Sequence, residues 1–339
     1  MKNRNNLIPI NTPVFLSATF LQKKPSQWGY SRVDDPTRLA LEKKLADVEN
    51  AKYALAFSSG SAAVTSLLML LKSGDHVLCH REIYEGTHRI LDKIMKGFGV
   101  SFGMANFNDA RELKNSMKPE TRMVFFETIT NPNLEVVDVA RVVDTAKGRG
   151  VLIVVDNTIA TPLFRNPLNE GADIVVHSLT KFISGSHDVT GGALMINDSQ
   201  LFERLGFVQR TTGAILSPLS CHLVDRGIET LSLRMEKHQK NAVRIAQFLK
   251  DHPKVDKVSF PGMSGLVSFI LAKGLRPKVF LKRLKKIGIA QSFGGTASTI
   301  LHPGSMMTLA NPVGASFFRL SVGTENIDEL IGDLKAALK

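Results

Sequence analysis

Two short apolar segments of this sequence each end in polar residues that could take part in catalysis. Residues 151–156 close on Asp156, and residues 173–177 are followed by Ser178, Thr180 and Lys181. Parallel strands present their carboxyl ends at one edge of a sheet, so Asp156 and Lys181 are expected to face one crevice. A carboxylate for a pyridinium nitrogen and a lysine for an aldehyde are the groups with which proteins hold pyridoxal phosphate (PLP) and use it as an electron sink. The two hydroxyls would suit its phosphate.

Taken singly, neither residue establishes such a site. Lys181 would form the Schiff base and later move protons on the substrate, but a lysine after a strand is also a common solvated residue. Asp156 would keep the ring nitrogen protonated, but it could equally cap the turn after a buried strand. The hypothesis therefore depends on further residues.

Three further segments carry groups that would complete the site. Residues 58–61 open an apolar helix, and free N–H groups at a helix N-terminus bind phosphate, although these serines could be a simple cap. Tyr84 follows a predicted strand and could stack on a cofactor ring or be an ordinary core tyrosine. Arg319 interrupts an apolar strand and needs a partner, either a substrate carboxylate or an internal salt bridge.

Size and composition are those of a globular protein with room for two domains. The chain has 339 residues, of which 43% are hydrophobic and 22% charged. A net charge of +12 makes a nucleic-acid-binding protein the alternative class, but one Trp and three Tyr leave few aromatic side chains for base stacking. The densest basic run, residues 278–286, has helical spacing and is expected to be the exposed face of an amphipathic helix.

The two cysteines and the N-terminus argue for a cytoplasmic protein. Cys79 and Cys221 form no spaced cluster, so we expect two buried free thiols, with no disulfide and no metal site. The first residues are basic but lack the apolar segment of a secretory signal. No run of about 18 apolar residues predicts a membrane span.

Helical and strand-like patterns alternate through the first two thirds of the chain, which predicts an α/β fold with a mainly parallel sheet. Strands are expected at 76–79, 123–127, 151–156, 173–177 and 193–196, and helices at 39–52, 62–71 and 136–147. A long helix is expected from Cys221 to His252, with a break near Gly227.

A smaller α+β domain is predicted after this helix. Strands are expected at 255–260, 266–271 and 317–322, and helices at 278–286 and 327–338. We therefore predict an N-terminal arm at 1–38, a large domain at 39–222 and a C-terminal domain at 223–339.

The motifs occur together in an order that resembles the Cys/Met-metabolism family of PLP-dependent enzymes. This family includes cystathionine γ-synthase, cystathionine γ-lyase, methionine γ-lyase and the O-acylhomoserine sulfhydrylases. The resemblance covers nearly the whole chain, and its motifs are together very specific. They lie at residues 30–37, 58–60, 84–87, 127–132, 155–158, 177–181 and 319–323.

The resemblance implies the aspartate-aminotransferase type of fold and a role for each matched residue. Lys181 and Tyr84 would be catalytic. The cofactor would be held by Lys181, Asp156, Gly60, Ser61, Tyr84, Asn131, Thr158, Ser178, Thr180, Tyr30 and Arg32. The substrate would be held by Arg319, Ser292 and Arg89. Because Tyr30 and Arg32 would reach the cofactor phosphate of a neighbouring subunit, the family implies an obligatory dimer, and a tetramer is expected.

The resemblance predicts a trans-sulfuration enzyme, a carbon–sulfur lyase or transferase that performs γ-replacement or γ-elimination on a homoserine- or homocysteine-derived amino acid. Methionine γ-lyase and O-acylhomoserine sulfhydrylase are the alternatives. Arg89 favours the cystathionine enzymes, whereas Gly29 and Gln291 stand where those enzymes usually have acidic residues. The run Gly185–Asp188 also departs from the usual order of its residues.

Overall fold

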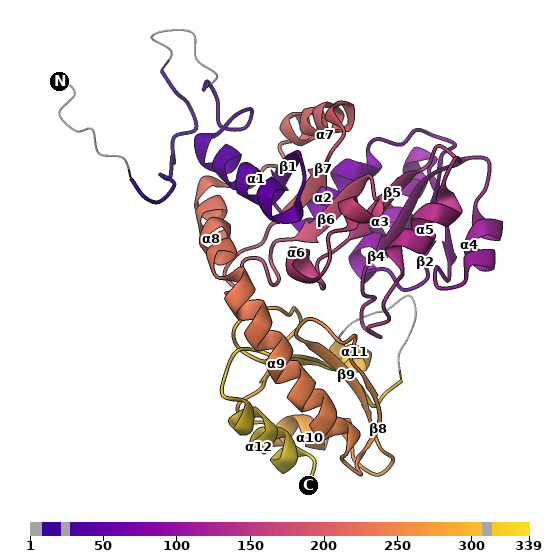
Figure 1. Cartoon of the computed structure of the whole chain (residues 1–339), viewed down its shortest axis with the longest axis vertical. Coiled ribbons are helices and arrows are strands. Elements are labelled where there is room, and N and C mark those ends of the chain that lie inside the picture. The colour runs from indigo at the N-terminus through magenta and orange to yellow at the C-terminus, as the bar shows by residue number, and fades with distance from the viewer. Residues whose placement is uncertain (1–8, 22–27, 307–313) are drawn as a thin grey trace.

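The computed structural model describes residues 9–21, 28–306 and 314–339, which form two β-sheets with helices packed on them (Figure 1). The larger sheet has seven strands: β1 (Tyr53–Phe57), β2 (His76–His80), β3 (Ser101–Ala105), β4 (Thr121–Glu127), β5 (Leu152–Asp156), β6 (Ile174–Ser178) and β7 (Gly192–Ile196). Their order is β1-β7-β6-β5-β4-β2-β3, and β7 runs antiparallel to both of its neighbours. The other pairings are parallel, so the predicted mainly parallel sheet is confirmed.

Helices cover both faces of this sheet, as the buried strands require. One face packs against α2 (Gly60–Leu68), α3 (Glu85–Lys93) and α7 (Ser199–Thr212). The other face packs against α1 (Pro36–Glu49), α4 (Ala110–Ser116) and α5 (Val139–Ala146). Three shorter helical segments are η1 (Met95–Phe98), α6 (Thr161–Phe164) and η2 (Pro167–Glu170). Strands β4, β5 and β6 are therefore enclosed on both sides, and their carboxyl ends remain available for a site.

Two consecutive helices, α8 (Pro218–Glu229) and α9 (Leu231–Lys250), lead to the smaller sheet (Figure 1). Its strands are β8 (Val255–Ser259), β9 (Leu266–Leu271), β10 (Gly288–Ile289), β11 (Thr299–Leu301) and β12 (Phe317–Ser321), in the order β10-β11-β12-β9-β8. The remaining helices are α10 (Pro277–Arg283), α11 (Pro303–Met306) and α12 (Ile327–Ala337).

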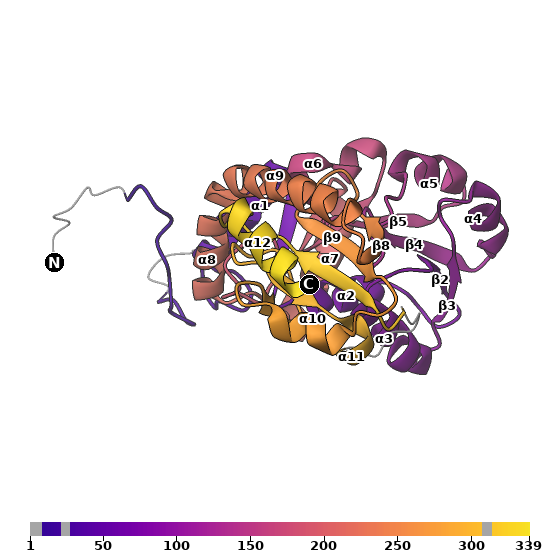
Figure 2. The ribbon, with the colours of Figure 1, turned by 90° about the horizontal axis from the view of Figure 1, so that it is seen from below.

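The two faces of the smaller sheet contact different parts of the protein. Helices α9, α10 and α12 pack on one face (Figure 2). Phe269, Phe280 and Phe318 form an aromatic cluster there. Side chains alternate along a strand, so Arg319, next to Phe318, points away from this cluster. The polar face is turned toward the larger sheet, since Ser268 Oγ donates to the carbonyl of Pro132 at 2.7 Å.

The predicted break near Gly227 is confirmed and lies three residues further on, because α8 ends at Glu229 and α9 begins at Leu231. Gly227 serves packing instead. A Cβ at this position would lie 2.6 Å from the carbonyl oxygens of Ile183 and Ser184, in the loop just after Lys181. Only glycine allows the helix to approach that loop so closely.

The remaining expectations about domains and cysteines have mixed outcomes. Cys79 and Cys221 are buried free thiols, as predicted. The boundary predicted at 222/223 falls inside α8 and stays a prediction, as does the extent of the arm at 1–38, of which residues 1–8 and 22–27 lie outside the described residues. No described helix is long and apolar enough to span a membrane.

Candidate active site

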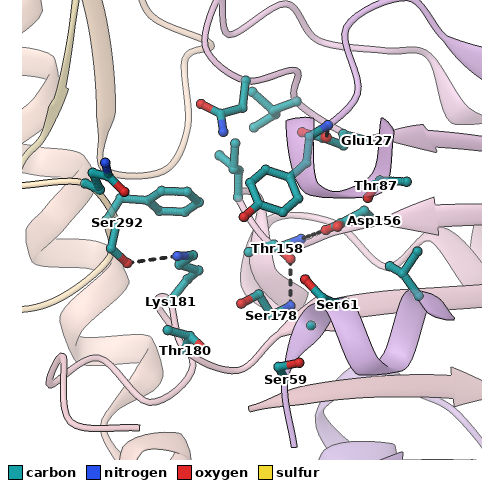
Figure 3. A pocket seen from close by; sticks show the side chains of 18 of the residues that line it. Ser59, Ser61, Thr87, Glu127, Asp156, Thr158, Ser178, Thr180, Lys181 and Ser292 are labelled. Atoms are coloured by element: carbon teal, nitrogen blue, oxygen red, sulfur yellow. Dashed lines mark hydrogen bonds between the residues drawn. The ribbon is translucent and has the colours of Figure 1, made fainter. Parts of the chain in front are cut away.

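A cavity of about 340 Å³ lies where the carboxyl ends of β4, β5 and β6 face the polar side of the smaller sheet. The predicted pair Asp156 and Lys181 both line it, together with Arg319 from β12. Figure 3 shows Lys181 and Ser292 on one side of the cavity, and Asp156, Thr158 and the serines of α2 on the other. The crevice expected from adjacent strand ends is therefore present.

The N-terminus of α2 and the end of β6 form a group of phosphate-type donors. Ser59 caps α2, with its Oγ accepting from the N–H of Ala62 at 3.0 Å, and Gly60 and Ser61 begin the helix beside the cavity. Gly60 fits tightly against Ser178, because a Cβ on it would lie 3.2 Å from the Ser178 Cβ. Hydroxyls and free N–H groups at a helix N-terminus suit a phosphate.

Two threonines fix the geometry around these donors. Thr158 Oγ1 accepts from the N–H of Ser178 at 2.8 Å, which ties the turn after β5 to the end of β6 (Figure 3). Thr180 Oγ1 accepts from the N–H of Gly191 at 3.0 Å and so holds the turn that contains Lys181. Both side chains line the cavity, and their predicted contact with the cofactor stays a prediction.

Asp156 presents a carboxylate at the base of the cavity. Its Oδ1 accepts from the N–H of Thr158 at 2.9 Å (Figure 3). Burial raises the pKa of Asp156, and the hydrogen bonds from Thr158 and the positive charge of Lys181 oppose that rise. A partly buried carboxylate held in this way is suited to a cationic ring nitrogen, which would stabilise its charged form.

Lys181 is held as an amine that loses its proton easily. Its Nζ donates to Ser292 Oγ at 2.8 Å and lies 5.0 Å from the ring centroid of Phe293. Burial and, next, the charge of Arg319 lower the pKa of Lys181 to about 8, while Asp156 acts in the opposite direction. A lysine with this pKa has an appreciable neutral fraction at physiological pH, which an attacking or proton-accepting amine requires.

Arg319 is a buried cation with hydrogen bonds to neutral acceptors. Its Nη1 donates to Asn131 Oδ1 at 2.7 Å, and its Nη2 donates to the carbonyl of Ser292 at 2.9 Å. Burial lowers the pKa of Arg319 to about 10, and its Nε has no partner within the described chain. Of the two alternatives from the sequence, the described residues supply no salt bridge, so the guanidinium charge is free for an external carboxylate.

Glu127 lines the same cavity, although no role was predicted for it from the sequence. It ends β4, pairs in register with Asp156 on β5, and accepts a hydrogen bond from the main-chain N–H of Tyr84. Tyr84 stands at the start of α3 and lines the cavity with 45% of its surface exposed. The signal that could have identified Glu127 is the one that identified Asp156, an acidic residue closing an apolar strand.

The remaining predicted residues lie outside the cavity lining. Arg89 is exposed on α3, and its predicted contact with substrate stays a prediction. Arg32 donates from Nη1 to the carbonyl of Arg210 at 2.6 Å, and its guanidinium lies 5.4 Å from the ring centroid of Tyr30. Neither arm residue reaches the cavity of its own chain. Of the two positions without the usual acid, Gln291 lines the cavity and Gly29 does not.

This arrangement of a lysine, a carboxylate, a phosphate-type cup and a buried arginine agrees with the sequence match. The family described as Cys/Met metabolism PLP-dependent enzyme matches residues 2–339. The chain belongs to this family. The described site fits PLP, because Asp156, Lys181 and the donors at α2 surround one cavity and each offers the chemistry that one end of the cofactor needs.

Named relatives and solved structures agree with this assignment. The chain is 41% identical to cystathionine gamma-lyase of Dictyostelium discoideum, over 96% of this chain and 92% of that protein. It is 37% identical to cystathionine beta-lyase of Coxiella burnetii, over 97% of this chain and 93% of that protein. The structure of cystathionine gamma-lyase from Lactobacillus plantarum complexed with L-serine superposes with a TM-score of 0.94 at 35% identity, over 96% and 92% of the two chains.

These similarities confirm the predicted fold class, the cofactor and the enzymatic nature of the chain. It has the α/β fold of PLP-dependent enzymes, uses PLP and acts in the metabolism of sulfur amino acids. The departing run Gly185–Asp188 lies outside the cavity lining.

Proposed function

We propose that the chain is a trans-sulfuration enzyme of the cystathionine γ-synthase/γ-lyase type. It would perform γ-elimination or γ-replacement on cystathionine or on a related homoserine- or homocysteine-derived amino acid. The observation that carries this proposal is the cavity in which Lys181, Asp156 and Arg319 come together. The names of the relatives, which include both gamma- and beta-lyases of cystathionine, support the substrate class.

Different residues of the chain would contact different parts of the cofactor. The α2 N-terminus with Gly60 and Ser61, and the hydroxyls of Ser178 and Thr180, would bind the phosphate; Asp156 would pair with the ring nitrogen. Tyr84 would stack on the ring, Asn131 would approach the ring hydroxyl, and Thr158 would hold the strand ends in place. When bound, PLP supplies an electron sink for the negative charge that develops on the substrate carbons.

Lys181 and Arg319 would act on the substrate. Arg319, buried and already oriented by Asn131 and Ser292, would bind the α-carboxylate and fix the amino acid relative to the lysine. With substrate bound, Lys181 would take the proton from Cα and deliver protons to the neighbouring carbons. Its lowered pKa supports this role, and Ser292 Oγ is placed to hold the amine at 2.8 Å.

Assembly completes the proposal. Tyr30 and Arg32 would contact the cofactor phosphate of a neighbouring subunit, so the dimer would be the smallest active unit and a tetramer is expected. Their position outside the cavity of their own chain is compatible with this role. We also expect the enzyme to work in the cytoplasm.

Methionine γ-lyase and O-acylhomoserine sulfhydrylase are the alternative activities, and the residues that face the distal end of the substrate would decide between them and the cystathionine enzymes. Gln291, a neutral amide, lines the cavity. A neutral amide favours a substrate without a distal ammonium more than a carboxylate would, because it offers no opposite charge. Arg89 is the residue that supports the cystathionine group.

Product identification tests the proposal. The purified holoenzyme is incubated separately with cystathionine, with methionine, and with O-acylhomoserine plus cysteine, and the products are identified by mass spectrometry. We expect cystathionine and water to yield cysteine, 2-oxobutanoate and ammonia, and the Lys181→Ala variant to be inactive. Consumption of methionine in preference to cystathionine would select the γ-lyase alternative, and no turnover of any of the three would contradict the proposal.

A further inference from the structure

Three carboxylates gather around the start of α3, and Glu127 lies between the other two. Glu127 and Asp156 are neighbours in register on β4 and β5. Glu82 lies on the other side, where its carboxylate accepts from Thr130 Oγ1 at 2.9 Å and from Asn133 Nδ2 at 2.7 Å. Three negative charges at one strand edge repel one another, so a proton on one of them is favourable.

Of the three carboxylates, Glu127 is the one whose surroundings most favour the protonated form. Its side chain is buried, the residue being 6% exposed, and it accepts one hydrogen bond, from Tyr84 N, within the described chain. Burial and then the charge of Asp156 raise the pKa of Glu127 well above its usual range, and Glu82 adds to the rise. Asp156 also has a raised pKa, but it has the cation of Lys181 near it and the hydrogen bonds of Thr158.

The partner of Glu127 is the main chain that carries the Tyr84 ring. Tyr84 begins α3 without a side-chain cap, and its N–H donates to Glu127, which ties this turn to the end of β4. The ring also folds over Gly86, since a Cβ on Gly86 would lie 2.3 Å from Tyr84 Cε1. Glu127 thus holds the backbone of Tyr84, and Gly86 leaves the space that its ring occupies.

We propose that Glu127 is a positioning residue that works as a neutral carboxylic acid: it fixes Tyr84 in the cavity without adding a second negative charge beside Asp156. This inference rests on the proposed PLP site. It explains why a carboxyl group can stand next to the residue that would pair with the ring nitrogen. A charged Glu127 would compete with Asp156 for that cation.

Two substitutions separate a neutral acid from a charged one. Glu127→Gln keeps an oxygen acceptor for the Tyr84 N–H and is neutral, whereas Glu127→Ala removes the acceptor. PLP is titrated into the cofactor-free proteins, and the pH dependence of the bound cofactor's absorbance is recorded. We expect Glu127→Gln to retain the dissociation constant within about twofold and to leave the pH midpoint unchanged, and Glu127→Ala to bind PLP about tenfold more weakly.

The opposite results would overturn the inference. If Glu127 is charged, Glu127→Gln removes a negative charge beside Asp156 and lowers the pH midpoint of the bound cofactor by about one unit. If Glu127 does not position Tyr84, Glu127→Ala binds PLP as the unsubstituted protein does. Gly86→Ala disturbs the same ring without touching the carboxyl group, so we expect it to weaken PLP binding while leaving the pH midpoint in place.

Folding and the underlying proposal are checked separately. Circular dichroism and thermal unfolding of the cofactor-free variants report the fold, and if Glu127→Ala does not fold, the pH midpoint of Glu127→Gln still decides the charge state. Borohydride labelling of Lys181 in the unsubstituted protein tests the PLP site itself. Absence of that label contradicts the proposed site, whereas normal labelling with a shifted midpoint in Glu127→Gln contradicts only the role of Glu127.

Discussion

Replacing Arg319 by a neutral residue should make Lys181 a stronger base. The pKa of Lys181 is lowered from the ordinary 10.5 to about 8 by burial and then by Arg319. At pH 7 this shift raises the neutral fraction of the amine from about 0.03% to about 10%, a gain of roughly 300-fold. The part that Arg319 contributes can be derived from the positions of the two cations.

Both cations lie close to the ring of Phe293, Lys181 Nζ at 5.0 Å and Arg319 Cζ at 4.9 Å from its centroid. They are therefore no more than about 10 Å apart, and at an effective dielectric constant of about 20 their repulsion is at least about 1.7 kcal/mol. That energy corresponds to about one pKa unit. Arg319→Gln should therefore raise the pKa of Lys181 to about 9, whereas Arg319→Lys, which keeps the charge, should leave it within a few tenths of a unit.

The pKa can be measured in the cofactor-free protein by labelling with acetic anhydride at a series of pH values. Mass spectrometry of the peptide that contains Lys181 then gives the extent of reaction of this one amine. We expect a midpoint near 8 in the unsubstituted protein and an upward shift only in Arg319→Gln. A midpoint near 10.5 in the unsubstituted protein, or one that Arg319→Gln does not move, would refute the electrostatic argument.

Three further substitutions test other parts of the structure. Gly227→Ala should destabilise the fold by about 1–3 kcal/mol in urea unfolding, because its Cβ would meet two carbonyl oxygens at 2.6 Å. The control Gly332→Ala, which has open space around it on α12, should be neutral or stabilising. Equal effects of the two substitutions would contradict the packing argument. Burial raises the pKa of Glu42 to about 7, so the contribution of Glu42 to stability is complete below about pH 4.5 and is lost as the pH rises through 7. The free energy of unfolding of Glu42→Gln should therefore rise by about 1–3 kcal/mol relative to that of the unsubstituted protein between pH 5 and pH 8. A difference that does not depend on pH would contradict this. Gln291→Glu should raise kcat/KM for cystathionine over methionine by about tenfold, and an unchanged ratio would show that this residue does not face the distal ammonium.

The part of the site that the sequence predicts best is built from neighbouring parallel strands. Asp156 and Lys181 follow strands that the apolar runs identify, and parallel pairing of β5 and β6 then brings their ends together. The helix after residues 58–61 is predicted by the same local pattern. These features depend on short-range periodicity and on one general rule of sheet topology, which is why no coordinates are needed to find them.

Contacts between the two sheets could not be derived in this way. The bond from Lys181 to Ser292 joins residues 111 positions apart, and no periodicity indicates it. Ser292 entered the predicted site only through resemblance to a family, and Arg319 was recognised from its apolar strand without its neighbours in the site. Gly227 shows the same limit, because a glycine that admits a neighbouring loop has the same local sequence signal as one that breaks a helix.

Two strands of the large sheet were not predicted from the sequence. β1 (Tyr53–Phe57) has the sequence YALAF, in which two alanines and a leucine favour a helix as readily as a strand. β3 (Ser101–Ala105) lies at the edge of the sheet and is only partly buried, so it lacks the apolar run of the central strands. Both strands are fixed by pairing with distant partners, β1 with β7 and β3 with β2.

The central claim is that Lys181 is the lysine that carries PLP in this cavity. Borohydride reduction of the purified holoenzyme, followed by proteolysis and mass spectrometry, tests it directly. We predict a single pyridoxyl adduct, located on Lys181, and its loss in Lys181→Ala. An adduct on a different lysine, or a protein that binds PLP without any reducible link to Lys181, would contradict the account.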